Sequence, residues 1–169
     1  GLYVGVATVG IFIYWYCFWE GTDGHSNIEL SQLMDWSNCP DWEKEGIEFN
    51  ITMEFRGITL NDPCDYFKDK GKAIPMTLSL SVLVTIEMLN AINSVSEEGS
   101  LVQMPPWVNP WLILAVVGSF AMHCLILYFD IFAKIFGVHP LARDEWLLVF
   151  AWSVPVMLID EVFKFILRQ

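Results

Sequence analysis

Apolar residues are gathered into four long stretches, and polar residues fill the segments between them. Each stretch contains roughly 20 residues, which is the length that an α-helix needs to cross the hydrocarbon core of a bilayer. The pattern therefore predicts an all-α membrane protein with four spanning helices. The predicted spans are residues 1–19, 76–95, 107–129 and 146–165. The predicted connections are residues 20–72, 96–106 and 130–145.

Aromatic rings and prolines mark the ends of the predicted spans. Trp107, Trp111 and Trp146 lie at span ends, as expected of an interfacial belt of rings that are apolar in body and polar at one edge. Pro75 lies at the start of a span, where the missing amide hydrogen costs little. Pro155 is different because it lies inside the fourth span, where we expect it to kink the helix.

Four spans place both ends of the chain on one side of the membrane and the 20–72 connection on the other. This connection contains Cys39 and Cys64, which can pair if they face an oxidising lumen. It also contains a glycosylation sequon that begins at Asn50 and is usable only on that side. Together these signals favour a lumenal connection, cytosolic chain ends and a Cys39–Cys64 disulfide, and they make Asn50 a candidate for glycosylation.

Glu87 is the strongest candidate for a functional residue because it lies near the middle of the second span. A carboxylate at bilayer depth costs free energy, so its presence predicts a role in an ion or proton path. Helical periodicity places it on one stripe with Ser79, Leu83, Asn90 and Ser94, of which all but Leu83 are polar. The stripe predicts contact with other helices or a hydrated cavity. A plain structural alternative is a protonated carboxyl that only bonds a neighbouring helix.

Glu87 alone cannot complete a calcium shell of six to eight oxygens, so other helices would have to supply the rest. The remaining ionisable residues in the spans favour structural roles. His123 is a lone imidazole, for which a hydrogen bond to an adjacent helix is the better account than a ligand role. Asp160 and Glu161 precede Lys164 by four and three residues, a spacing that predicts an interfacial ion pair.

Composition agrees with a membrane protein and excludes several functions. Hydrophobic residues make up 54% of the chain and the mean hydropathy is +0.45. The net charge of −11 arises mostly in the 20–72 connection, so it indicates a solvated segment and gives no support for a nucleic-acid partner. The sequence contains no recognisable phosphate loop, nucleophile–base pair or metal cluster, so we expect no catalytic residue here. The chain also starts inside an apolar stretch, which indicates a piece of a larger protein.

Long runs of the chain resemble one protein family over nearly its whole length. They are similar to the last four membrane helices of the sarco/endoplasmic reticulum calcium ATPases, and they are Thr77–Ser94, Met104–Asn109, His123–Asp130 and Asp160–Ile166. The opening Gly1–Gly10 resembles the start of the seventh helix in that family. The 20–72 connection looks longer than usual, but its two cysteines resemble the family's lumenal disulfide.

The resemblance implies a role for Glu87 and for the fragment. Glu87, in Thr-Ile-Glu-Met, matches the eighth-helix carboxylate that binds one of two transported calcium ions. The family pumps calcium from cytosol to reticulum lumen, using ATP and a phosphorylated aspartate, and Mg and ATP would bind in domains outside this segment. The expected location is the endoplasmic or sarcoplasmic reticulum membrane. The expected partners are the bilayer, the remaining helices and cytosolic domains of the same pump, and small regulatory membrane peptides.

Two other classes of protein remain open at this point. A four-span junction protein resembling claudins accounts for the span count and the cysteine pair, but it does not account for Glu87. An ion-channel subunit would use Glu87 without ATP machinery. A phosphorylation motif upstream of Gly1 would decide for the pump.

Overall fold

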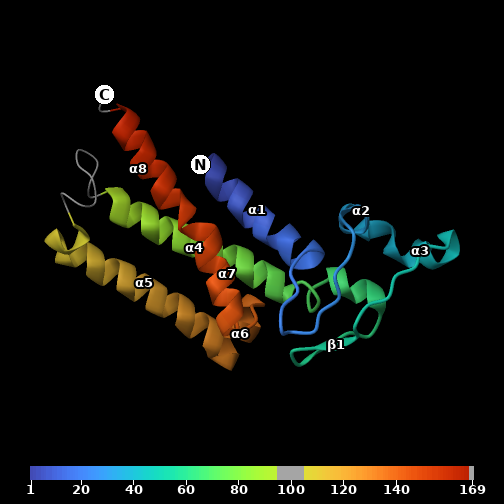
Figure 1. Ribbon diagram of the computed structural model, residues 1–169. Coiled ribbons are helices and arrows are strands. Elements are labelled where there is room, and N and C mark those ends of the chain that lie inside the picture. The colour runs from blue at the N-terminus through green and yellow to red at the C-terminus, as the bar shows by residue number, and fades with distance from the viewer. Residues whose placement is uncertain (95–104, 168–169) are drawn as a thin grey trace.

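The computed structural model describes residues 1–94 and 105–167, which form a bundle of helices with a small extension at one end (Figure 1). Regular structure is almost entirely helical. The α-helices are α1 (Leu2–Cys17), α2 (Leu30–Met34), α3 (Cys39–Glu45), α4 (Ala73–Ser94), α5 (Pro110–Tyr128), α6 (Asp130–Phe136), α7 (Arg143–Ser153) and α8 (Pro155–Leu167). Short 3-10 helices are Trp36–Asn38, Pro63–Phe67 and Pro106–Val108, and two antiparallel strands are β1 (Glu54–Phe55) and β2 (Ile58–Thr59).

Helix α4 is the centre of the bundle, because α1, α5, α7 and α8 all contact it (Figure 1). Ile74, Leu78, Val82 and Ile86 are fully buried along one side of α4. Their spacing of four residues places them on one stripe of a helix. This stripe forms the middle of the apolar core, and the other helices pack around it.

Three helical segments are long and apolar enough to cross a membrane, namely Ala73–Ser94, Pro110–Tyr128 and Arg143–Leu167. They confirm the last three predicted spans. The first predicted span also forms a helix, but α1 has 16 residues and is therefore shorter than the roughly 20 needed for a full crossing. Val95, predicted as the end of the second span, and the 96–104 part of the following connection lie outside the described residues.

The third span starts three residues later than predicted because local capping fixes its first turn. The side chain of Asn109 accepts a hydrogen bond from the amide of Leu112 at 3.3 Å, and Pro110 occupies the first helical position. Both features are typical of a helix start. Trp107 consequently belongs to the preceding 3-10 turn.

The fourth span is interrupted where Pro155 was expected to kink it. Helix α7 ends at Ser153 and α8 begins at Pro155, with Val154 between them. Proline has no amide hydrogen, so it cannot donate the backbone hydrogen bond that continues a helix. At the break the hydroxyl of Tyr3 on α1 donates to the carbonyl oxygen of Trp152 at 2.7 Å. A neighbouring helix thus satisfies a backbone acceptor beside the interruption.

The connection 130–145, expected as a plain loop, contains the short helix α6. Asp130 lies in its first turn and Lys134 in its last, so both charges complement the helix dipole. Gly137 ends the helix with a left-handed φ of 66°, which glycine adopts without strain. These local signals explain why seven residues fold as a helix between two spans.

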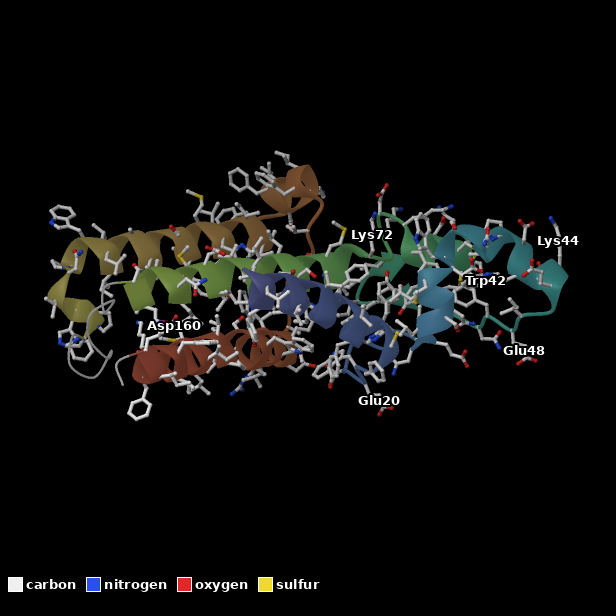
Figure 2. All side chains as sticks on the ribbon, turned by 90° about the horizontal axis from the view of Figure 1, so that it is seen from above. Glu20, Trp42, Lys44, Glu48, Lys72 and Asp160 are labelled. Atoms are coloured by element: carbon white, nitrogen blue, oxygen red, sulfur yellow. A yellow bond between two sulfur atoms is a disulfide. The ribbon has the colours of Figure 1, made fainter. Side chains whose placement is uncertain are left out.

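The 20–72 connection is folded around aromatic side chains, and this differs from the solvated segment that its charge predicts. Trp42, Phe55 and Tyr66 are buried, and Tyr66 accepts a hydrogen bond at its carbonyl oxygen from the hydroxyl of Tyr16 on α1 at 2.8 Å. Figure 2 shows this segment as an extension beyond the helices, with Trp42 inside it and Lys44 and Glu48 at its outer end. A small core therefore fixes the extension to the bundle.

Candidate functional site

Glu87 lies on α4, seven residues before Ser94, and thus about 10 Å from that end of the helix. A helix of 22 residues has a length of about 33 Å, close to the thickness of a hydrocarbon core. The structure therefore places this carboxylate well inside the span, as the sequence predicts.

The side of α4 that presents Glu87 is left open by the other helices of this chain. Glu87, Leu83 and Asn90 are exposed, whereas Val82 and Ile86 on the opposite side are fully buried. Charged and amide side chains on an open face at this depth point to a neighbour that the bundle itself does not provide. The predicted polar stripe is confirmed over this part of α4.

Ser79, which the sequence placed on the same stripe, has a different role. Its hydroxyl donates to the carbonyl oxygen of Thr8 at 2.6 Å and so joins α4 to α1. The stripe is therefore divided. Its first turn belongs to the α1–α4 contact, and only the later turns, including Glu87, remain open.

Oxygen donors around Glu87 are too few to bind a cation without help. Within residues 1–94 and 105–167 there is no group of three His, Cys, Asp or Glu side chains that could hold a metal ion. Calcium takes six to eight oxygens, so Glu87 and the nearby Asn90 can supply only part of a shell. The arrangement suits a site that is completed by other helices.

His123 has the structural role that the sequence favours. Its Nε2 atom lies 2.9 Å from the hydroxyl oxygen of Ser81, so the bond joins α5 to α4, and both residues are buried. A buried imidazole with a hydroxyl partner is satisfied without any ion. We therefore assign His123 to helix packing.

The charged residues near the end of the fourth span form the predicted ion pairs. Lys164 Nζ lies 3.1 Å from an oxygen of Asp160 and 3.9 Å from one of Glu161. Lys164 also donates to the side-chain and backbone oxygens of Asn93, and the Asn93 amide donates to Asp160. This cluster fastens α8 to the end of α4, two turns beyond Glu87.

The disulfide expected in the 20–72 connection is present. Cys39 and Cys64 are bonded, with their Cα atoms 5.8 Å apart. Closing a loop of this length stabilises a fold by roughly 3.5 kcal/mol on the chain-entropy model. Cys17 and Cys124 are free thiols and are half-buried. Asn50 is exposed on an irregular segment, and its glycosylation stays a prediction.

Two polar pairs in the predicted connections were missed at the sequence level. His25 Nδ1 lies 2.5 Å from Asp23, and the imidazole stacks on Trp15 with ring centroids 3.9 Å apart. Arg56 donates to Glu145, 89 residues away, with an N–O distance of 2.5 Å. The pair of Arg56 and Glu145 leaves no local signal in the sequence, because its members are far apart. The Asp-Gly-His sequence of the first pair is typical of a turn and could have been used to predict it.

Comparison with known proteins is consistent with this architecture. A family profile described as "Cation transporting ATPase, C-terminus" matches residues 1–166. The chain belongs to this family. The match confirms the resemblance to the C-terminal membrane helices of cation-transporting ATPases, and it decides against a junction protein of the claudin class.

Individual relatives of this cation-transporting ATPase segment point the same way. The chain is 53% and 49% identical to the endoplasmic reticulum-type calcium-transporting ATPases 4 and 2 of Arabidopsis thaliana, in each case over 99% of its length. It is 46% identical over its whole length to a calcium-transporting ATPase of Plasmodium falciparum (isolate K1 / Thailand). The chain spans 16%, 17% and 13% of these three relatives, respectively.

Proposed function

We propose that this chain is the C-terminal membrane part of a calcium pump, and that Glu87 supplies carboxylate oxygen to a transported calcium ion. The observation that carries the proposal is the position of Glu87, deep in a span and on a face that the bundle leaves open. The names of the relatives supply the ion, because all three are calcium-transporting ATPases. Calcium is thus the cargo of the pump.

The other parts of the proposal follow from the family. The intact protein moves calcium from the cytosol to the lumen of the endoplasmic or sarcoplasmic reticulum and is driven by ATP, with Mg and ATP bound outside this segment. Both ends of the chain face the cytosol, and the disulfide-bearing connection 20–72 faces the lumen, where a disulfide persists. Small regulatory membrane peptides are a further class of partner that we carry over to this chain.

Bound calcium compensates the charge of Glu87 in this proposal. A lone carboxylate at bilayer depth is costly. A calcium ion held against its oxygens places two positive charges beside it and offsets that cost.

Replacing Glu87 by Gln in the intact pump tests the ligand role. Glutamine keeps the size of the side chain and removes its charge, so we expect the calcium affinity of one site to fall at least about tenfold, equivalent to 1.4 kcal/mol. Equilibrium binding of radioactive calcium at neutral pH gives the number of ions bound per pump and their affinity.

Glu161→Gln is the matched control, because Glu161 is a glutamate near the end of the fourth span that interacts with Lys164. We expect calcium binding to be unchanged in this variant. Unaltered stoichiometry and affinity in Glu87→Gln would remove the ligand role from Glu87.

A further inference from the structure

Helix α6 presents large apolar side chains that nothing in the described part of the chain covers. Ile131 is 72% exposed, Ile135 70% and Phe136 59%, whereas Ala133 is buried. Soluble segments rarely display so many large apolar groups on seven residues. The surface therefore calls for a partner.

The apolar and the charged side chains of α6 lie on different sides of the helix. At 100° per residue, Ile131, Phe132, Ile135 and Phe136 occupy one broad face. Asp130 and Lys134, four residues apart, lie together on another side. A helix with this division, lying at a boundary between water and hydrocarbon, is typical of an interfacial membrane segment.

The position of α6 fits such a boundary. It follows α5, a segment long and apolar enough to span a membrane, after a turn at Phe129 with extended backbone angles. The last residue of α5, Tyr128, accepts a hydrogen bond from the indole nitrogen of Trp146 at 2.7 Å and donates to the carbonyl oxygen of Leu141 at 3.0 Å. Tyrosine and tryptophan joined in this way mark the level of the headgroups.

We propose that α6 lies in the surface of the bilayer and that its partner is lipid. Ile131, Ile135 and Phe136 enter the acyl-chain region of the leaflet on the side of the disulfide-bearing connection. Lys134 extends its alkyl stem along this surface and places its ammonium group among the lipid phosphates. The apolar face carries no hydrogen-bonding side chain, which suits hydrocarbon better than the polar rim of a protein interface.

This surface holds the C-terminal half of the bundle at a fixed depth. α6 contacts α5 directly, and the segment after it reaches α4, where the amide of His139 donates to the hydroxyl of Thr77 at 3.0 Å. An anchored α6 therefore sets the height of α4 in the membrane. The inference does not depend on the role of Glu87, because it concerns lipid contact only.

Photocrosslinking in the intact pump tests the proposal. Benzoylphenylalanine is placed at Ile135 in one variant and at Lys134 in a matched second variant, and each pump is irradiated in phospholipid vesicles. We expect phospholipid adducts, detected by mass spectrometry, to be at least several-fold more abundant at position 135. Adducts at position 135 to another part of the pump, or equal lipid labelling at both positions, would overturn the proposal.

A second measurement covers the case of an inefficient crosslink. Spin labels are attached to Ile135→Cys and Lys134→Cys in a pump whose other reactive cysteines have been replaced. Oxygen, which partitions into hydrocarbon, should relax the label at position 135 more strongly than a water-soluble nickel complex does. The reverse order is expected at position 134, and a water-exposed label at position 135 would contradict membrane insertion.

Discussion

Single residues at the start of the 20–72 connection show how a polar pair is held beside an aromatic core. The ring of His25 stacks on Trp15, its Nδ1 faces Asp23, and its Nε2 lies 2.9 Å from the carbonyl oxygen of Trp15. Burial alone would raise the pKa of Asp23, but the hydrogen bonds and charge of His25 outweigh burial and lower this pKa. The folded chain therefore stabilises the ionised carboxylate.

The lowered pKa of Asp23 predicts a loss of stability in acid. A carboxylate whose folded pKa is depressed contributes stability above its ordinary pKa of about 3.9, and this contribution disappears as pH falls through the folded value. We expect Asp23→Asn to lower the melting temperature at pH 7 and to lose this difference from the wild type below about pH 4. Thermal unfolding of the purified pump between pH 7 and pH 3 measures both.

Asp41→Asn is the control for this experiment, because Asp41 pairs with Lys44 on an exposed surface. Exposed pairs contribute little, so its melting temperature should follow that of the wild type at each pH. If the melting temperatures of Asp23→Asn and the wild type differed by the same amount at every pH, the ionised carboxylate of Asp23 would not contribute to stability.

At the scale of elements, the contact between α1 and α7 depends on a glycine. A Cβ atom added at Gly10 would lie 2.6 Å from the ring carbon Cζ3 of Trp152, closer than atoms can pack. The ring of Tyr14 lies against Trp152, with centroids 5.9 Å apart, so the indole has a neighbour on that side as well. The close approach needs a residue without a side chain.

Gly10→Val should therefore separate α1 from α7. Overpacking a filled contact costs about 1–3 kcal/mol, so we expect the melting temperature of the intact pump to fall. Gly5→Val is the matched control on the same helix, because nothing lies within 4 Å of the Cβ position at Gly5. Equal melting temperatures for the two variants would show that the indole moves aside freely.

Helices whose length and hydropathy are distinctive could be predicted from the sequence, and contacts between distant residues could not. The three longest spans and the break at Pro155 follow from local composition and from the missing amide of proline. Helix α6 was missed because a segment of seven residues is too short to show a helical period.

The same limit applies to the candidate site. Glu87 was found because a carboxylate in an apolar run is conspicuous without any partner. On α1 the glycine that meets a neighbouring helix is Gly10, and no local feature of the sequence distinguishes it from Gly5. The contacts within the folded core of the 20–72 connection could not be predicted, because a disulfide and rings that are far apart in sequence assemble it.

For the whole molecule, one ion pair joins the two connections on the same side of the bundle. Arg56, at the turn between β1 and β2, donates to Glu145 at the start of α7 and to the carbonyl oxygen of Pro140 at 2.7 Å. Glu145 is only 2% exposed, and its carboxylate also accepts from the amide of Ala142 at 2.6 Å. The pair fixes the disulfide-bearing extension to the base of the fourth span.

Removing Arg56 should weaken this junction strongly. Arg56→Ala leaves the buried carboxylate of Glu145 without its cation, which costs about 3–5 kcal/mol. We expect a marked fall in the melting temperature and faster amide hydrogen exchange in α7. Lys44→Ala, which removes an exposed partner of Asp41, is the control and should change neither quantity measurably. Unchanged exchange in α7 of Arg56→Ala would assign the junction to other contacts.

The pair between Arg56 and Glu145 also sets an order for biosynthesis. A ribosome adds roughly 5–20 residues per second, so the 89 positions between the two side chains correspond to a delay of roughly 4–18 s. During this interval Arg56 has been made while its acceptor has not. A folding factor that shields the newly made arginine would act within that window.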